Sequence, residues 1–437
     1  MTTKNIPRNQ PSRVGDAAGP ALPRRAEWLF FLEYYAAAGG APSLATDQVS
    51  SNPLGIHDWA QRLEAAVGVV LRSGHTVTPF RNGVEIFPRM LRAIASASVS
   101  IEFLFFIYQD GEVAHEICDA LIDRAESGIR VKVLLDGFGS KPMPKSIRQK
   151  FNESAVDLQV FHPLPQWKFW ATDARTHRKI LVVDGKLGFT GGVGISHEWS
   201  GDAEGPNQFR DTQVSVRGPA VASLRAAFFG NWAAAGGRLP ENLDVPGHSA
   251  PFEGGTWAGV LAATGATQWS EIALLFQLLT LHARKTLDIV TPYFVPGPAL
   301  AADLANAAKR GVDVRIMTSG RNTDQRMSRW AGQRYYSNLL SAGARIFEYD
   351  RTLQHVKAVV VDQRMVCIGS PNMNQRSTSQ DDEIALLTFD RSLANELRAD
   401  FKADLNDSRS IDGKKWASRG FIRRARELAA SVLEAQL

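Results

Sequence analysis

Two short stretches of the chain repeat one spacing of a histidine, a lysine and an aspartate, H-x-K-x4-D. The two copies are His177-Lys179-Asp184 and His355-Lys357-Asp362, and we take all six residues as candidate catalytic residues. An apolar run after each lysine predicts a buried strand, on which side chains two residues apart point to the same face. An imidazole beside an ammonium group suits phosphate chemistry. The imidazole can attack phosphorus or transfer a proton near neutral pH, and the ammonium opposes charge on phosphate oxygens.

Further polar residues follow the second copy in the turn Gly369-Ser-Pro-Asn372. Its glycine lets the backbone come close to a ligand, and Asn372 offers an amide donor. We expect phosphate to be bound by Lys179, Lys357, Ser370 and Asn372. The first copy has Gly194 where the second has Asn372, so we expect the two halves to hold the phosphate unequally.

Two such faces that meet in one cleft predict a two-step reaction. One histidine attacks phosphorus, and the other protonates the leaving alkoxide and then deprotonates the next alcohol or water. The intermediate is a phosphohistidine, and these residues alone do not choose which histidine is the nucleophile. The spacing indicates no metal site, and the mechanism calls for no cofactor.

The elements around the two copies repeat as well. Helix, strand, helix and strand are expected at 87–97, 99–107, 113–127 and 129–135, and again at 272–281, 287–294, 300–310 and 311–317. The two histidines lie 178 residues apart, and Gly128 and Gly311, beside the second strand of each set, lie 183 apart. Near-constant offsets indicate an internal duplication. The pattern predicts an α/β fold of two similar lobes, each a mostly parallel sheet flanked by helices, related by pseudo-twofold symmetry.

The same pattern sets the expected domain boundaries. We expect a disordered tail over 1–25, a helical segment over 26–75, the first lobe over 76–240, a linker over 241–258, the second lobe over 259–405 and a basic amphipathic helix over 406–437. In that last helix, apolar residues recur three and four positions apart from Phe421 to Leu433, with the arginines largely off the stripe. Such a stripe serves an anionic membrane surface or the protein core equally well.

The composition leaves the partner open. The net charge of +5 fits an anionic partner, whether a membrane surface, a phosphate ester or nucleic acid. A nuclease needs a long basic groove, and so modest an excess gives no sign of one, so we expect no nucleic acid. No stretch reaches the roughly 20 apolar residues of a membrane span. We expect a cytoplasmic protein, peripheral on the inner face of the cell membrane, with Trp167, Phe169 and Trp170 dipping into the interface.

The chain resembles the phospholipase D superfamily, and within it the bacterial cardiolipin synthases. The resemblance covers about 76–404 and rests on Thr176-His-Arg-Lys-Ile-Leu-Val-Val-Asp-Gly185, Phe189-Thr-Gly-Gly192, Thr291-Pro-Tyr-Phe-Val-Pro296 and Tyr335-Tyr336. It implies a two-lobed α/β fold and phosphatidyl transfer between phospholipids through a phosphohistidine. It also implies that His177 is the nucleophile and His355 the acid/base, and that Asp211 and Glu383 each orient a histidine.

Three functions remain open at this point. The first is a phosphatidyltransferase that uses phosphatidylglycerol, and the second is a phospholipase D that releases phosphatidic acid, or a nuclease with the same site. The third is a membrane-binding protein with an inactive site, against which the two intact motifs speak. Because one chain carries both motifs, a complete site requires no oligomer.

Overall fold

The computed structural model describes residues 52–163, 175–240, 251–265 and 271–431. The expected tail at 1–25, the aromatic residues Trp167, Phe169 and Trp170, and positions 241–250 of the expected linker lie outside these ranges. Residues 50–437 form one compact unit that contains both motifs.

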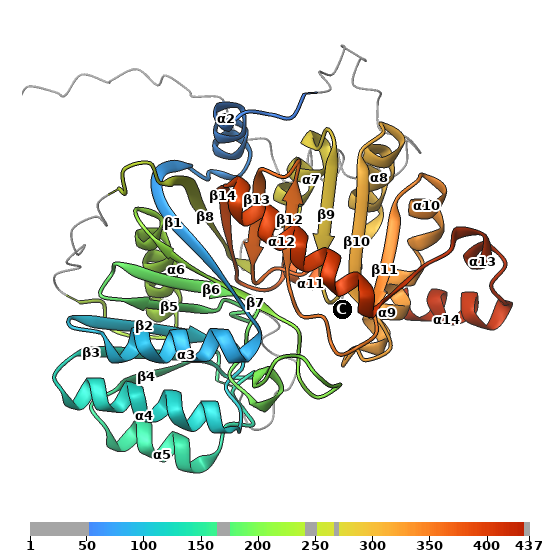
Figure 1. The fold of residues 1–437 in the computed structure, drawn as a ribbon. Helices are drawn as coiled ribbons and strands as arrows, with labels where there is room; N and C mark the ends of the chain where they lie inside the picture. Colours follow the sequence, from blue (N-terminus) through green and yellow to red (C-terminus); the bar gives the residue numbers. More distant parts are fainter. Residues whose placement is uncertain (1–51, 164–174, 241–250, 266–270, 432–437) are drawn as a thin grey trace, which may run out of the picture. The chain divides into compact units, whose positions relative to one another are not determined.

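The first lobe begins with a strand at the centre of the sheet, and helices connect several of the strands that follow (Figure 1). Its elements are β1 (Arg72–Arg81), α3 (Asn82–Ala95), β2 (Ser100–Phe105), α4 (Glu112–Glu126), β3 (Arg130–Asp136), α5 (Lys145–Glu153), β4 (Asp157–Phe161), β5 (Ile180–Val183), β6 (Leu187–Gly191), β7 (Thr212–Arg217) and α6 (Ala220–Ala234). Helix α2 (Ile56–Val67) precedes it and packs on the second lobe through Trp59 and Leu63.

The second lobe repeats this order. Its elements are β8 (Thr256–Ala263), α7 (Glu271–His282), β9 (Thr286–Val290), α8 (Gly297–Lys309), β10 (Asp313–Ser319), α9 (Arg326–Gln333), α10 (Tyr336–Ser341), β11 (Arg345–Tyr349), β12 (Ala358–Val361), β13 (Met365–Gly369), α11 (Gln375–Ser379), β14 (Glu383–Phe389) and α12 (Arg391–Asp404).

Within the described residues, one sheet of 15 strands runs through both lobes. Outward from β1 the order is β7-β6-β5-β2-β3-β4, and outward from β8 it is β14-β13-β12-β9-β10-β11. The two central strands, β1 and β8, pair antiparallel, as a twofold axis between them requires. The predicted class of two similar α/β lobes with pseudo-twofold symmetry is therefore confirmed.

Strand direction corrects one detail of that prediction, because neither lobe is mostly parallel. Helical crossovers, such as α4 between β2 and β3, make parallel pairs, whereas tight turns make hairpins. The hairpins β5–β6 and β12–β13 turn through Asp184 and Asp362, which have φ of 52° and 50°.

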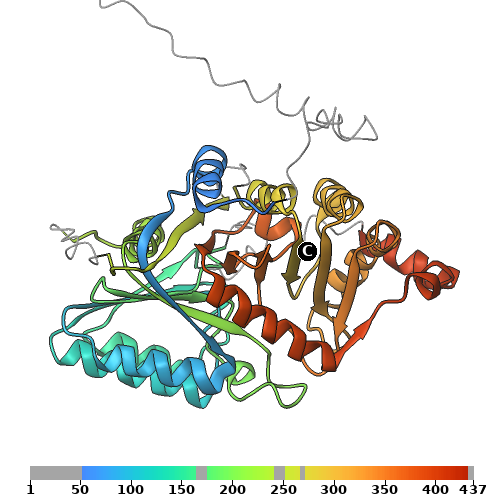
Figure 2. The ribbon, with the colours of Figure 1, turned by 45° about the horizontal axis from the view of Figure 1, so that its top comes forward.

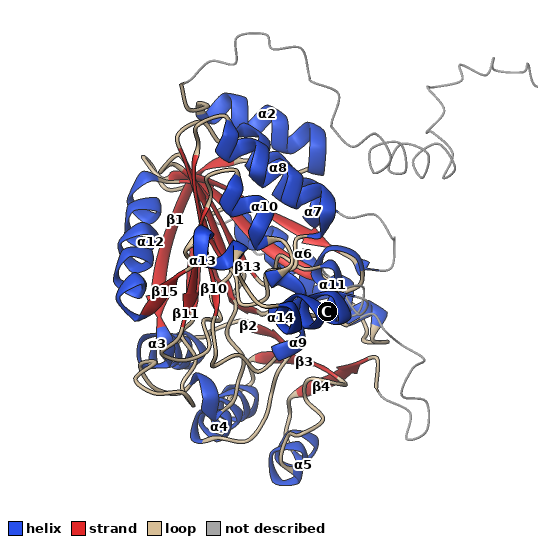
Figure 3. Cartoon of the chain, turned by 90° about the vertical axis from the view of Figure 1, so that its right-hand side faces the viewer, coloured by secondary structure: helices blue, strands red, loops and turns tan. Residues whose placement is uncertain are grey.

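Helices cover both faces of the sheet in each lobe. In the second lobe α12 lies on one side of the strands and α7, α8 and α10 lie on the other (Figures 2 and 3). In the first lobe α3, α4 and α5 bury one apolar core, while α6 lies on the opposite face. Apolar side chains on the faces under α6 and α12 combine in one core shared by both lobes. This shared core fixes the lobes against each other.

The C-terminal segment 406–437 is not a single helix. It contains β15 (Ser408–Ser410), which pairs with β11, then α13 (Gly413–Ala417) and α14 (Phe421–Ser431). The Asp412 side chain caps α13 by accepting from the Lys415 amide, and Gly420 separates α13 from α14. Across the described ranges, the helices are too short or too polar to traverse a bilayer.

Candidate active site

Each motif histidine lies where a short backbone bridge joins the two lobes. The His177 amide donates to the carbonyl of Asp382 at 2.9 Å, and the His355 amide donates to the carbonyl of Arg210 at 2.7 Å. The bridges are equivalent under the pseudo-twofold symmetry, because Asp382 directly precedes Glu383 and Arg210 directly precedes Asp211. Each motif is thereby brought beside the acidic residue of the other lobe.

The histidine–carboxylate pairs cross between the lobes. Nδ1 of His177 lies 2.9 and 3.1 Å from the two carboxylate oxygens of Glu383, at the start of β14. Nδ1 of His355 lies 2.7 Å from Oδ2 of Asp211, directly before β7. Both carboxylates are fully buried. Neither lobe alone holds a histidine together with its carboxylate.

The two lysines and the two histidines influence one another electrostatically. Burial, then the charges of Lys179, Lys357 and Arg376, lowers the pKa of His177 well below its usual value. Burial, then the Lys357 charge, lowers the pKa of His355 to about 4, and Lys179 contributes to that shift. Since each lysine acts on the histidine of the opposite lobe, the four groups belong to one site.

The lysines themselves are buried, and the effect of burial outweighs that of the carboxylates near them. Burial lowers the pKa of Lys179 to about 7 and that of Lys357 to about 8. Their ammonium groups donate to the carbonyls of His177 and His355 at 2.6 and 2.7 Å. Both cations are therefore held against the motif backbone, where an anion in the site would be drawn to them.

The pKa values of the two carboxyl groups are shifted in opposite directions. Burial raises the pKa of both, but at Asp211 the charges and hydrogen bonds of His355, Lys357 and Trp199 outweigh burial and lower the net pKa. At Glu383 burial prevails, and its pKa is raised despite Lys179 and Ser370. Asp211 thus favours a cationic partner more strongly than Glu383 does.

The motif aspartates lie away from this chemistry, which corrects their expected catalytic role. Five residues of extended chain, about 16 Å, separate each motif lysine from its aspartate. The Asp184 carboxylate instead accepts from the backbone amides of Ser98, Val99 and Ser100 at 2.7–3.1 Å. The Asp362 carboxylate accepts equivalent bonds from the backbone amides of Arg284, Lys285 and Thr286. Each aspartate ties its hairpin to the start of β2 or β9.

We expect Asp184→Asn to destabilise the fold and spare the chemistry. The amide would place an N–H group against backbone donors that now meet a carboxylate, which should lower the free energy of unfolding by about 2–3 kcal/mol. Urea unfolding and kcat, corrected for folded protein, measure both effects. Asp362→Asn should behave alike, and exposed Asp123→Asn should change neither. If stably folded Asp184→Asn lost more than about tenfold in kcat, Asp184 would have a catalytic role and this prediction would be wrong.

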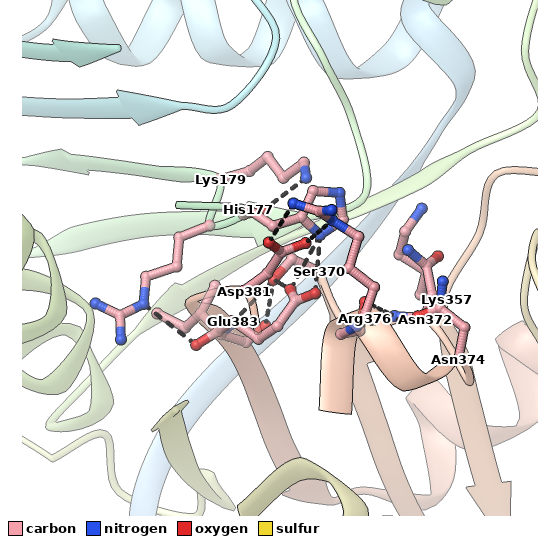
Figure 4. Close-up of polar contacts among 12 residues, drawn as sticks. His177, Lys179, Lys357, Ser370, Asn372, Asn374, Arg376, Asp381 and Glu383 are labelled. Carbon is pink, nitrogen blue, oxygen red and sulfur yellow. Dashed lines mark hydrogen bonds and ion pairs between the residues drawn. The ribbon is translucent and has the colours of Figure 1, made fainter. Parts of the chain in front are cut away.

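Ser370, expected to bind phosphate, makes its hydrogen bonds within the protein. Its hydroxyl donates to the carboxylate of Glu383 and accepts from the Ile384 amide at 3.0 Å. Asn372 is buried, and within the described residues its side-chain oxygen has no hydrogen-bond partner. Figure 4 shows it beside Lys357. The structure therefore leaves the amide oxygen of Asn372 without a partner among the described residues and makes Ser370 a support for Glu383.

The glycine at position 194 has a steric cause. A Cβ atom there would lie 2.9 Å from the Trp199 ring and 3.0 Å from Ile107. The Trp199 indole N–H donates to Asp211 at 2.9 Å, and the ring meets the His355 ring edge-on at 5.1 Å between centroids. Trp199 thus supports Asp211 as Ser370 supports Glu383. Its indole ring occupies the space in the first lobe that a side chain at position 194 would need.

Sequence reasoning missed several groups around the histidines. Besides Trp199, these are Phe106, whose ring meets that of His177 edge-on at 5.1 Å, and the pair of Arg376 and Asp381 (Figure 4). Arg376 donates to both carboxylate oxygens of Asp381, at 3.0 and 3.1 Å. Burial raises the pKa of Asp381 to about 7. The polar run from Asn372 to Asp381 was the only signal for this pair, and nothing in it indicated proximity to His177.

The described residues offer no group of three or more His, Cys, Asp and Glu side chains placed to hold a metal ion. The site is instead rich in cations and paired acids. Duplicated α/β lobes that share one site built from two H-x-K motifs define the class of protein: an enzyme with the phospholipase D fold.

Comparisons with known proteins narrow this class. The family described as "Cardiolipin synthase, PLD-like domain" matches residues 90–207 and 277–405, one stretch in each lobe. Cardiolipin synthase 2 of Bacillus cereus is 33% identical over 382 residues, which cover 85% of this chain and 73% of that protein. The cardiolipin synthase of Alkalihalophilus pseudofirmus is 31% identical over 354 residues, covering 80% and 70%. The chain therefore belongs to the phospholipase D-like family of cardiolipin synthases.

A solved structure supports the fold independently. Phosphatidylserine synthase of Haemophilus influenzae Rd KW20 superposes with a TM-score of 0.63, covering 88% of this chain and 100% of that one, at 17% identity. At 17% identity, this match supports only the arrangement of helices and strands.

Proposed function

We propose that the chain transfers a phosphatidyl group between phospholipids through a phosphohistidine, with phosphatidylglycerol as the substrate. The observation that carries this proposal is the crossed pairing of His177 with Glu383 and of His355 with Asp211. Family membership supports it, because the related proteins are named cardiolipin synthases. We place the reaction at the anionic inner face of the cell membrane, with one complete site in each chain.

In the first step Nε2 of His177 attacks phosphorus. The P–N bond forms, the bond from phosphorus to the leaving alkoxide breaks, and His355 donates a proton to that oxygen. In the second step His355 takes the proton of the acceptor hydroxyl, whose oxygen attacks phosphorus and releases His177. Lys179, Lys357 and Asn372 hold the non-bridging oxygens throughout.

The electrostatics favour His177 as the nucleophile. Its strongly lowered pKa keeps the ring neutral, as attack requires, and Nδ1 is engaged by Glu383, which leaves Nε2 to face phosphorus. The charged Asp211 carboxylate raises the pKa of His355, but burial and the Lys357 charge still lower that pKa to about 4, so His355 needs further negative charge nearby to hold a proton. A bound phosphodiester anion supplies that charge, which suits His355 as the proton donor.

Incubation with labelled phosphatidylglycerol vesicles tests the proposal. Cardiolipin plus glycerol is the expected product pair. Phosphatidic acid as the sole product, with or without added alcohol, would establish the second candidate function, a phospholipase D. The distinction depends on whether the acceptor is held well enough to exclude water, since a well-placed hydroxyl reaches effective molarities of about 10⁵ M or more.

The lysine pKa values predict a fall of kcat/KM on the alkaline side. As pH rises through about 7 and about 8, first Lys179 and then Lys357 lose the proton that gives them charge toward phosphate. We expect kcat/KM to decline above about pH 7. The decline of kcat should begin at a higher pH, because bound phosphate favours the charged lysines. In Lys179→Arg, which stays charged, the decline of kcat/KM should begin near pH 8. A profile that is flat from pH 6 to 9 would contradict this prediction.

A further inference from the structure

The helix α14 packs on the protein through a polar contact. Glu427 is 2% exposed and pairs with Arg419, whose Nε and Nη2 atoms lie 2.8–3.2 Å from the carboxylate. Ala430 is also buried, and the Arg426 guanidinium lies over the Trp330 ring of α9 at 4.5 Å. The ion pair and these contacts fix the rotation of the helix.

The fixed rotation turns apolar side chains of the expected stripe toward solvent. Phe421 is 83% exposed and Leu428 is 62% exposed, the two largest values among the exposed large apolar side chains of the described residues. Ala425 is exposed as well. The apolar stripe was expected to pack in the protein core or to contact a membrane surface. Phe421, Ala425 and Leu428 do not pack in the core.

A pocket lies beside Leu428, where residues of α10, α13 and α14 and of the segments next to them come together. Figures 1 and 3 show where these three helices lie. The volume of the pocket is about 430 Å³, and its lining consists of Arg334, Ser337, Ala417, Arg419, Glu427 and Leu428. Arg334 is exposed, and its guanidinium has no hydrogen bond or ion pair with the described residues, whereas Arg419 is neutralised by Glu427. One uncompensated positive charge therefore stands in a pocket whose rim includes Leu428.

We propose that this pocket and its apolar rim dock the protein on a bilayer by binding the headgroup of an anionic phospholipid. The Arg334 guanidinium meets the phosphate with its fork of donors, and Phe421 and Leu428 enter the interface beside it. Exposed Lys414 and Lys415 on α13 add positive charge toward an anionic surface. The surface is distinct from the active site, since none of these residues contacts the two motifs.

Vesicle sedimentation with the full-length His177→Ala protein tests the proposal, because this background removes the proposed nucleophile. We expect binding to vesicles that contain phosphatidylglycerol and little binding to pure phosphatidylcholine. Arg334→Gln should weaken the former about fivefold, the worth of one basic residue near the surface. Phe421→Asp should weaken it about tenfold or more, because an aromatic ring no longer enters the interface. Both positions are exposed, so thermal unfolding of the variants should match the parent.

Matched variants elsewhere provide the control. Val84→Asp and Arg92→Gln change an exposed apolar and an exposed basic residue of α3, and both should bind like the parent. Parent-like binding by Arg334→Gln and Phe421→Asp would overturn the proposal. So would light scattering that shows a dimer broken by Phe421→Asp, since a second copy would then cover the surface. In an otherwise unaltered chain, both variants should turn over detergent-dispersed substrate normally, which separates docking from the proposed chemistry.

Discussion

His177→Ala is expected to abolish turnover, with a loss of at least about 10⁴-fold, because it removes the atom that bonds to phosphorus. His355→Ala should be similarly inactive on a phospholipid, whose alkoxide leaves only with a proton. A phosphatidyl ester of p-nitrophenol separates the two roles, since nitrophenolate leaves without a proton. His355→Ala should release one equivalent of nitrophenolate and then stall, while His177→Ala should release none. Rapid-mixing absorbance measures the burst, and intact-protein mass measures the added phosphatidyl group.

The opposite pattern would exchange the two roles. A burst in His177→Ala and none in His355→Ala would make His355 the nucleophile. Near-normal turnover of the phospholipid by either variant would exclude the two-histidine mechanism altogether. Asp123→Asn serves as the control for expression and handling, because Asp123 is an exposed residue in the last turn of α4.

The fold could be predicted where local pattern and duplication agreed. The expected helix 113–127 is α4 (Glu112–Glu126), and the expected strand 129–135 is β3 (Arg130–Asp136). Prediction failed at strand direction, because alternating helices and strands imply parallel pairs only where a helix connects the strands. The β5–β6 hairpin turns at Asp184-Gly185, a residue pair typical of tight hairpins, whereas the β12–β13 hairpin turns at Asp362-Gln363, where both residues have positive φ without a glycine.

The site was predicted by residue type more fully than by role. The two motifs, Asp211 and Glu383 do meet, but linear spacing does not show that each acid serves the other lobe's histidine. The constancy of Asp184 and Asp362 within the repeated motif suggested catalysis, whereas both residues satisfy backbone amides. Trp199 could not be foreseen, because its contact with Asp211 depends on the path of the loop between them.

Crossed pairing makes the packing of the lobes part of the catalytic geometry. Arg178, between the first motif's histidine and lysine, points away from them and donates to the backbone carbonyls of Glu383 at 3.2 Å and Ala263 at 2.7 Å. It also donates to the side chain of Asn231 on α6. The residue inside the motif thus anchors the first lobe to the second, at the strand that supplies the partner of His177.

Glu383→Gln is expected to reduce kcat by about 10²–10⁴-fold without unfolding the protein, as loss of the charge that orients a catalytic histidine does elsewhere. The glutamine keeps the volume but can turn its N–H group toward Nδ1, which then accepts a hydrogen bond and leaves the proton on Nε2. A protonated Nε2 cannot attack phosphorus. Asp211→Asn should act on the other step, by depriving a protonated His355 of its counter-charge.

The nitrophenyl ester again distinguishes the two effects. Glu383→Gln should lose the burst of nitrophenolate, whereas Asp211→Asn should keep the burst and slow the turnover that follows. Trp199→Phe provides a graded comparison, because it preserves the ring beside His355 and removes only the indole N–H that supports Asp211. It should resemble a mild form of Asp211→Asn and leave the burst intact. If both carboxylate variants lost the burst equally, each acid would serve the site as a whole, and the assignment of one histidine to each step would lose its electrostatic basis.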